Sequence, residues 1–246
     1  MIADPDILPP VIFEDDALIA FNKPSGLLVA PDRWDKTRPN LMRMVHEQLS
    51  PDFFNVHRID AETSGVLLCA KTKPALDAVS RMFETREVRK LYLAITRGVP
   101  SKTSGSVRKS LAPDEHNPGR MRIVHVGKPC ETLIEVVRKW RGFTLVEAVP
   151  LTGRTHQIRV HLAFLHSPIV GDTFYGDGRG VCLSEFKPGY KAHADREERP
   201  LIGRLGLHAQ RLMFKHPVTG ADMTIEAPLP KDFAVAIKYL DRFAVR

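Results

Sequence analysis

Apolar and polar residues alternate along much of this chain, and the pattern predicts a protein built mainly from strands. Val11 to Phe13 and Ala17 to Phe21 alternate on either side of an acidic turn, which predicts a hairpin. Val66 to Ala70 is a short apolar run typical of a buried strand, and residues 90–97 alternate again. The first hundred residues therefore indicate a sheet.

Four segments show helical spacing of their apolar residues instead. Residues 41–49 and 76–83 have this spacing, and the second segment follows Pro74, a residue suited to a first helical turn. Residues 155–166 and 233–240 are the other two predicted helices. We expect these helices to pack beside the strands, which makes the predicted fold class α+β.

A second hairpin is predicted where residues 134–140 and 143–149 flank the turn Arg141-Gly142. Two stretches fall outside these patterns, residues 101–128, with six Lys or Arg against two acids, and residues 176–206. We interpret both as surface excursions from one domain, because no linker or internal repeat divides the chain.

Composition narrows the class of protein. The 246 residues are 43% hydrophobic, enough for an ordinary core, and the net charge of +7 favours a polyanionic partner. The three cysteines have no disulfide or zinc-site spacing. No leader peptide and no apolar run of membrane-spanning length is evident, so we expect a cytoplasmic protein without a membrane partner, and a monomer.

The segment from His57 to Thr72 is the most informative part of the sequence. It places Asp60 between the basic pair His57-Arg58 and a Thr-Ser-Gly turn that leads into the buried strand. An aspartate before such a turn often only accepts backbone N–H bonds. The alternative is that this carboxylate is positioned for chemistry.

Two further segments carry candidate side chains. Residues 90–98 form a strand pattern in which Tyr92 is a large aromatic residue with a polar tip. Residues 150–162 form a turn and helix that are rich in cationic and amide donors, including Arg154, His156 and Arg159.

Together the three segments resemble the signature of the RluA-type family of RNA pseudouridine synthases. The resemblance extends from the loop at residues 22–26 to residues 207–217, and Ile59 stands where that family usually has Leu. It implies the pseudouridine synthase fold, a mixed, mainly antiparallel sheet with flanking helices and a central cleft. It also implies one catalytic domain over residues 1–246, without the separate N-terminal RNA-binding module of some relatives.

The resemblance further implies an isomerase that converts uridine to pseudouridine in structured RNA, either rRNA or tRNA, without a cofactor or metal. Asp60 corresponds to the catalytic aspartate, and the sequence leaves open whether it attacks ribose C1′ or removes a proton to form a glycal. Tyr92 is expected to lie against the uracil and to handle the C5 proton. Arg159 is expected to pair with Asp60 through its guanidinium fork.

Several basic side chains near these segments are expected to contact RNA: His57, Arg58, Lys23, Arg154 and His156. Arg58 is the candidate wedge that fills the stack when a uridine is extruded, although a local pair with Glu62 is an equal alternative. For Lys23 a structural role in its loop is the safer expectation. Arg154 is assigned to a phosphate contact, and His208 and His216 to support of the sheet.

Three other functions remain as alternatives. His156, His161 and His166 invite a metal site, but residues five apart do not share a helix face. Asp60 with Glu62 could serve a glycosidase, but two neighbours on an extended segment leave no evident place for the water. The strongest rival is an RNA-binding or ribosome-assembly factor on the same fold, with catalysis secondary. Selection of the uridine is assigned to residues 101–128.

Overall fold

The computed structural model describes residues 7–32, 35–191 and 197–245, which form two compact units. The first unit contains residues 1–91 and 208–228, and the second contains residues 92–207 and 229–246. A single catalytic domain over residues 1–246 stays a prediction, and each unit is described by itself. Residues 1–6, on which the expectation of no leader peptide partly rests, lie outside the described residues.

The sheet of the first unit is built around the buried strand that the apolar run predicted. Its strands are β1 (Val11–Glu14), β2 (Leu18–Lys23), β3 (Phe54–Asn55), β4 (Ser64–Ala70), β10 (Leu207–Lys215) and β11 (Asp222–Glu226). They are ordered β1-β2-β4-β10, with β3 on β4 and β11 on β10, and only β4 and β10 pair in parallel. The predicted N-terminal hairpin is confirmed as β1–β2.

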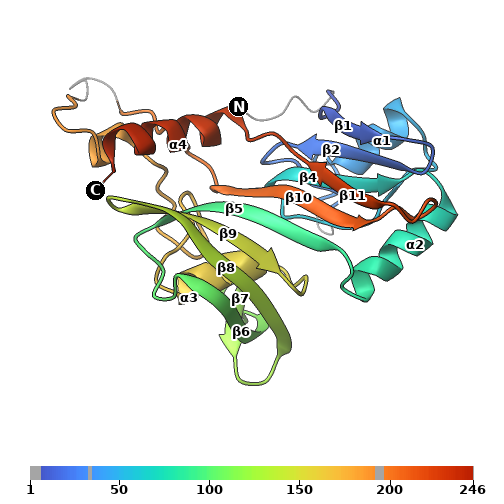
Figure 1. The fold of residues 1–246 in the computed structure, drawn as a ribbon, viewed down its shortest axis with the longest axis horizontal. Coiled ribbons are helices and arrows are strands. Elements are labelled where there is room, and N and C mark those ends of the chain that lie inside the picture. The colour runs from blue at the N-terminus through green and yellow to red at the C-terminus, as the bar shows by residue number, and fades with distance from the viewer. Residues whose placement is uncertain (1–6, 33–34, 192–196, 246) are drawn as a thin grey trace. The chain divides into compact units, whose positions relative to one another are not determined.

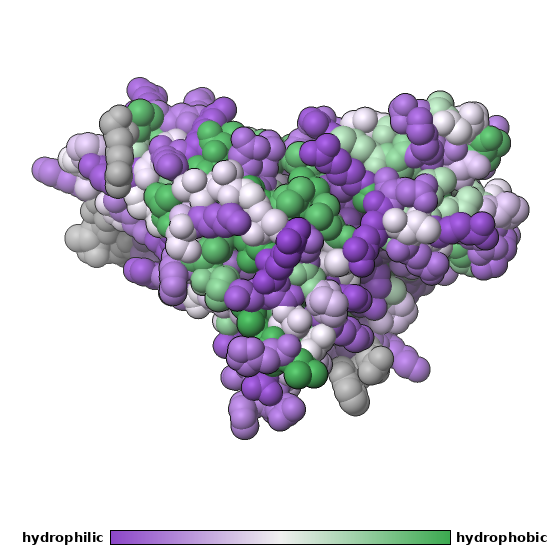
Figure 2. All heavy atoms as spheres, turned by 60° about the horizontal axis from the view of Figure 1, so that its bottom comes forward, coloured by the Kyte–Doolittle hydropathy of each residue, from purple (hydrophilic) through white to green (hydrophobic). Residues whose placement is uncertain are grey.

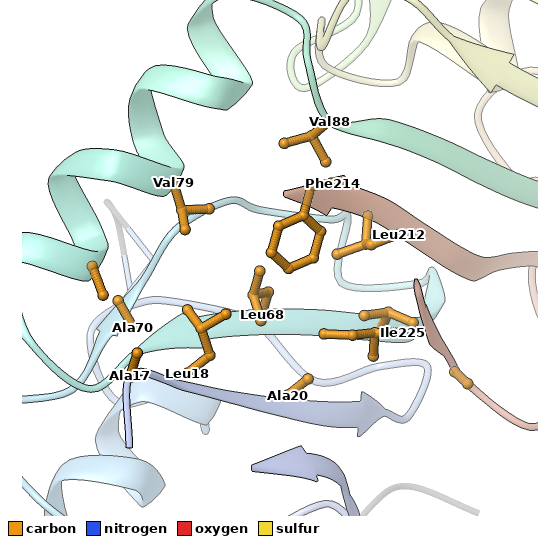
Figure 3. Packing of buried hydrophobic residues seen from close by; sticks show 13 residues of the cluster. Ala17, Leu18, Ala20, Leu68, Ala70, Val79, Val88, Leu212, Phe214 and Ile225 are labelled. Carbon is orange, nitrogen blue, oxygen red and sulfur yellow. The ribbon is translucent and has the colours of Figure 1, made fainter. Parts of the chain in front are cut away.

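Two predicted helices belong to this unit and begin at side-chain caps. Asn40 accepts the N–H of Arg43 at the start of α1 (Leu41–Gln48), and Thr72 caps α2 (Lys73–Glu84) in the same way. Figure 3 shows Val79 of α2 facing the core, in which Leu68, Phe214 and Ile225 are all at least 95% buried. The α2 residues with helical spacing therefore cover one side of β4.

The second unit has an antiparallel sheet whose strands are mostly consecutive in sequence. Its strands are β5 (Arg89–Arg97), β6 (Ser104–Pro113), β7 (Met121–Val124), β8 (Lys128–Trp140) and β9 (Phe143–Pro150). They are ordered β5-β9-β8-β6-β7. The predicted second hairpin is confirmed as β8–β9.

Residues 101–128 are not the surface excursion that the sequence suggested. They form β6 and β7, and β6 lies between β8 and β7 with Val107 and Leu111 buried. The strands were missed because serine, glycine and charged residues interrupt the apolar alternation. The pairing of β6 with β8, and of β7 with β6, supplies the backbone hydrogen bonds that the local pattern could not predict.

Helices cover both faces of this second sheet. Val146 and Ala148 of β9 pack with Ile158 and Leu162 of α3 (Gln157–Phe164). Leu145, which points to the opposite face, packs with residues of α4 (Lys231–Phe243). A short 3-10 helix, η1, spans Leu183–Glu185. The ribbon in Figure 1 shows α3 and α4 on opposite sides of β9.

Hydrophilic residues predominate on the molecular face in Figure 2, and hydrophobic residues appear there in small groups. None of the helices in the described ranges combines the length and apolarity needed to cross a membrane.

Candidate active site

Asp60 lies in the turn between β3 and β4, and a buried lysine holds that turn. The ammonium of Lys23 donates to the carbonyl oxygens of Pro24 at 2.8 Å, Leu27 at 2.7 Å and Ala61 at 2.9 Å. Lys23 has no exposed surface. The three bonds join the loop after β2 to the residue that directly follows Asp60.

Two more bonds tie the same loop to the Asp60 turn. The Gly26 N–H donates to the Ala61 carbonyl at 2.7 Å, and the Ser25 hydroxyl donates to the Glu62 carbonyl at 2.5 Å. Gly26 has a φ of 93°, a conformation that residues with a Cβ rarely adopt. The backbone that directly follows Asp60 is therefore fixed from the β2 loop. The expected contact of Lys23 with RNA stays a prediction.

The strand that follows Asp60 is anchored at its start by His208 of β10. The Ser64 hydroxyl lies 3.0 Å from His208 Nδ1, and His208 Nε2 lies 3.3 Å from the Ala227 carbonyl. A Cβ on Gly65 would lie 2.1 Å from the Ala209 carbonyl oxygen, so this position accepts only glycine. These contacts match the expected role of His208 in supporting the sheet.

His57 packs inside the first unit. Its ring stacks on Phe83 with centroids 5.0 Å apart, and its Nε2 accepts the Leu68 N–H at 3.0 Å. Burial, aided by the nearby charge of Lys90, lowers the pKa of His57 to about 3. The imidazole is therefore neutral at pH 7, with the proton on Nδ1. Its contact with RNA stays a prediction.

Arg58 is exposed, in contrast to its neighbour. Among the described residues Arg58 forms no ion pair, so the alternative local pair with Glu62 is not formed. Its role as a wedge stays a prediction.

Tyr92 lies near the start of β5, opposite Ala148 of β9. The side chain is partly buried against the cluster that includes Ala94, Ile158 and Leu207. One part of the ring thus contributes to packing in the second unit.

The turn before α3 is fixed by Gln157. Its Oε1 accepts from the Thr152 hydroxyl at 2.7 Å and the Arg154 N–H at 3.1 Å. Its Nε2 donates to the Glu131 carbonyl and the Thr132 hydroxyl, both at 2.9 Å. All four bonds connect the turn to β8 or close it on itself. The Arg154 side chain points toward the Pro129 carbonyl at 3.5 Å, and its phosphate contact stays a prediction.

Arg159, on the first turn of α3, is 2% exposed and forms a two-bond pair with Asp172. Nε donates to Asp172 Oδ2 and Nη2 donates to Oδ1, each at 2.8 Å. The guanidinium carbon also lies 5.2 Å from the Phe174 ring centroid and 5.4 Å from that of Tyr175. The carboxylate and the two rings together fix the plane of the guanidinium.

Asp172 was missed in the sequence. Burial by itself raises the pKa of this carboxyl, but the hydrogen bonds and charge of Arg159 outweigh burial and hold the pKa below its usual value. The signal that could have found it is a lone acid followed by two aromatic residues between glycines, in residues 171–176.

Tyr175 and Phe174 connect the arginine to its surroundings. The Tyr175 hydroxyl accepts the Met121 N–H at 2.7 Å and lies 2.8 Å from His156 Nδ1. The guanidinium of Arg120 lies 5.3 Å from the Phe174 centroid. His156 itself has a φ of 54° at the start of α3, and its contact with RNA stays a prediction.

The three histidines of the α3 region have different surroundings. His161 is fully buried, with Nε2 3.2 Å from the Cys130 sulfur and Nδ1 2.9 Å from the Thr132 hydroxyl. Burial lowers the pKa of His161 to about 4. His166 is exposed beyond the helix end. Across the residues described here, no group of three His, Cys, Asp or Glu side chains has the arrangement of a metal site.

The expected catalytic residues are divided between the units. Asp60 belongs to the first unit, and Tyr92 and Arg159 belong to the second. The pairing of Arg159 with Asp60, and the convergence of all three, stay predictions.

Known proteins match this chain over most of its length. A sequence model described as RNA pseudouridylate synthase matches residues 17–164. Ribosomal large subunit pseudouridine synthase D of Neisseria meningitidis serogroup B is 36% identical over 227 residues, 90% of this chain and 58% of that protein. The chain therefore spans little more than half of that relative. Dual-specificity RNA pseudouridine synthase RluA of Escherichia coli K12 is 37% identical over 220 residues, 89% of this chain and 92% of that protein.

Solved structures agree with these matches. Human RNA Pseudouridylate Synthase Domain Containing 1 has a TM-score of 0.72 at 25% identity and covers 99% of this chain and 91% of its own. Human RNA Pseudouridylate Synthase Domain Containing 4 has a TM-score of 0.68 at 26% identity, with 96% and 94% covered. The predicted α+β pseudouridine synthase fold is confirmed, and the chain belongs to the RNA pseudouridylate synthase family, within its RluA type.

Proposed function

We propose that this chain converts uridine to pseudouridine in structured RNA, either rRNA or tRNA, with Asp60 as the essential residue. The observation that carries the proposal is the Asp60 turn, whose backbone is clamped by Lys23 within the matched family segment. A turn held so firmly keeps one carboxylate in a constant position, which proximity catalysis requires.

The reaction breaks the bond between ribose C1′ and uracil N1 and forms one between C1′ and C5. The C5 proton is lost and N1 gains a proton, so atoms and charge balance without a cofactor. Asp60 acts at the sugar, either as a nucleophile at C1′ or as a base that yields a glycal. Tyr92 lies against the detached uracil and handles the C5 proton, while Arg159 keeps the Asp60 carboxylate ionised.

The substrate uridine must leave its stack before Asp60 reaches the sugar. Arg58 is exposed, directly precedes the Ile59-Asp60 turn and forms no ion pair with any described acid, so its side chain can fill the vacated space. Lys23, His57, Arg154 and His156 complete the proposed RNA-facing set. A monomeric state and a cytoplasmic location belong to the same proposal.

The decisive experiment compares the wild type with Asp60→Asn and with Asp52→Asn, an exposed carboxylate in the preceding turn. Pseudouridines are mapped in rRNA and tRNA from cells that carry each variant in place of the native gene. In parallel, purified proteins are assayed for tritium release from RNA labelled at uracil C5. We expect Asp60→Asn to abolish both signals and Asp52→Asn to retain both.

Retention of tritium release by Asp60→Asn would overturn the proposed role of this aspartate. Restoration of normal growth by Asp60→Asn without modification would favour the rival function, an RNA-binding or ribosome-assembly factor.

A further inference from the structure

We propose that Asp172 is a positioning residue for Arg159, which it holds by one guanidinium edge so that the other edge meets the reacting groups. The inference rests on the proposed function and adds a residue to it. Asp172 touches neither substrate nor Asp60 in this proposal, and acts through Arg159 alone.

The contact between the two residues has the geometry of a specific pair. Both side chains are almost completely buried, at 2% exposure for Arg159 and 1% for Asp172. Both oxygens of the carboxylate are used, each at 2.8 Å from a different guanidinium nitrogen. A planar fork bound at two points has little freedom to tilt or to slide.

Asp172 is itself held rigidly, so it can serve as a reference point. Its Oδ1 accepts the N–H groups of Phe174 at 2.9 Å and Tyr175 at 3.1 Å. Its carbonyl accepts the N–H groups of Gly176 and Gly178, both at 3.1 Å. The preceding Gly171 has a φ of 70°, and a Cβ there would lie 2.1 Å from the Arg204 carbonyl oxygen, so only glycine fits at this close approach of two backbone segments.

The pair with Asp172 also sets the direction of the second edge of the Arg159 guanidinium. Asp172 takes Nε–H and one hydrogen of Nη2, which form one edge of the group. Nη1 and the second hydrogen of Nη2 form another edge, whose direction is then set by Asp172. A displacement of about 1 Å in a reacting or positioning group can slow a reaction about 100-fold. Release of the guanidinium from Asp172 should therefore lower the rate about 100-fold.

The arrangement also determines the local charge. The hydrogen bonds and charge of Arg159 keep Asp172 ionised, so the two residues together carry no net charge. A buried arginine without this partner would relax toward other acceptors, at the expense of its orientation.

The test uses Asp172→Asn, Arg159→Lys and the double variant, with Asp177→Asn as the matched control. Asp177 lies in the same loop and pairs with Arg179 and Arg97 instead of Arg159. Single-turnover tritium release and equilibrium binding are measured on one RNA that the wild type modifies. Thermal unfolding monitors the fold of each variant.

We expect Asp172→Asn to slow single turnover about 100-fold and to change RNA affinity less than about threefold. The double variant should be no slower than the slower single variant, because both substitutions disrupt the same Arg159–Asp172 pair. Asp177→Asn should keep the wild-type rate. A merely structural role of Asp172 would weaken binding together with rate and would make the two losses multiply.

Asp172→Glu provides a second route if Asp172→Asn does not fold, because it retains the counter-charge and displaces it by one methylene. A folded Asp172→Glu with the wild-type rate would overturn the inference, as would wild-type turnover by Asp172→Asn. If Asp60→Asn or Arg159→Lys retains full activity, the proposed function fails first. If those two lose activity and the Asp172 variants do not, only the inference fails.

Discussion

Two buried cations, one in each unit, are stabilised in different ways. Lys23 has three backbone carbonyls around its ammonium, and Arg159 has one carboxylate and two aromatic rings around its guanidinium. The lysine organises the main chain around it, whereas the arginine is itself organised by side chains. We infer that the first arrangement shapes a turn and that the second presents a functional group.

The largest effect is expected from Lys23→Met. Removing the ammonium leaves the partly buried carbonyl of Pro24 and the buried carbonyl of Leu27 without this donor, so the free energy of unfolding should fall by about 3 to 5 kcal/mol. Urea unfolding measures it. Lys73→Met, which removes an exposed lysine paired with Asp77, is the control and should cost less than about 1 kcal/mol. Equal losses in the free energy of unfolding for the two variants would contradict the stabilising role assigned to the Lys23 ammonium.

Arg159→Lys should affect the other cation differently. The charge remains but the two-point fork is lost, so turnover should fall about 100-fold, or about 2.7 kcal/mol, with RNA binding nearly unchanged. Steady-state kinetics and equilibrium binding on the same RNA separate the two quantities. Parallel losses in turnover and binding would count against the expected pairing with Asp60.

Arg58 provides the exposed counterpart to both buried cations. Arg58→Ala should raise the RNA concentration for half-saturation about tenfold, because the energy of unstacking is no longer offset. Activity on an RNA whose target uridine is already unstacked should be spared. A uniform loss on both RNAs would exclude the wedge.

His57 extends the comparison to a basic group that is partly buried and carries no charge at pH 7. Its folded-state pKa of about 3 lies below the usual value near 6.5, so only the unfolded chain takes up a proton between these values. Stability should therefore be lost as the pH falls from about 6.5 toward 3, by up to about 1.4 kcal/mol per pH unit. Urea unfolding of wild type and His57→Gln between pH 7.5 and 4.5 tests this. An unchanged pH slope in the variant would contradict it.

Elements with a clear hydrophobic period could be predicted from the sequence. The β1–β2 and β8–β9 hairpins and the helices α1, α2 and α4 were predicted because each buries a face with a regular apolar repeat. The helix α3 was predicted without such a face, since residues 157–162 are all buried. The β6 and β7 strands were not predicted, since β6 depends on pairing with β8, β7 depends on pairing with β6, and their residues alternate poorly.

The candidate site was predictable only in part, for a similar reason. Asp60, Tyr92 and Arg159 stand out by their neighbours along the chain. Asp172 lies 13 residues from Arg159 and contributes through a tertiary contact that no local motif encodes. The carbonyl contacts of Lys23 with Ala61 likewise span 38 residues and involve a backbone atom, so side-chain identity carries little information about them.

The Tyr175 hydroxyl has a mechanical consequence. It is bonded to the backbone at the start of β7, and its ring lies against the guanidinium of Arg159. A shift of the backbone at Met121 would therefore move the phenol that lies against Arg159. The orientation of the guanidinium thus depends on the edge of the second sheet as well as on Asp172.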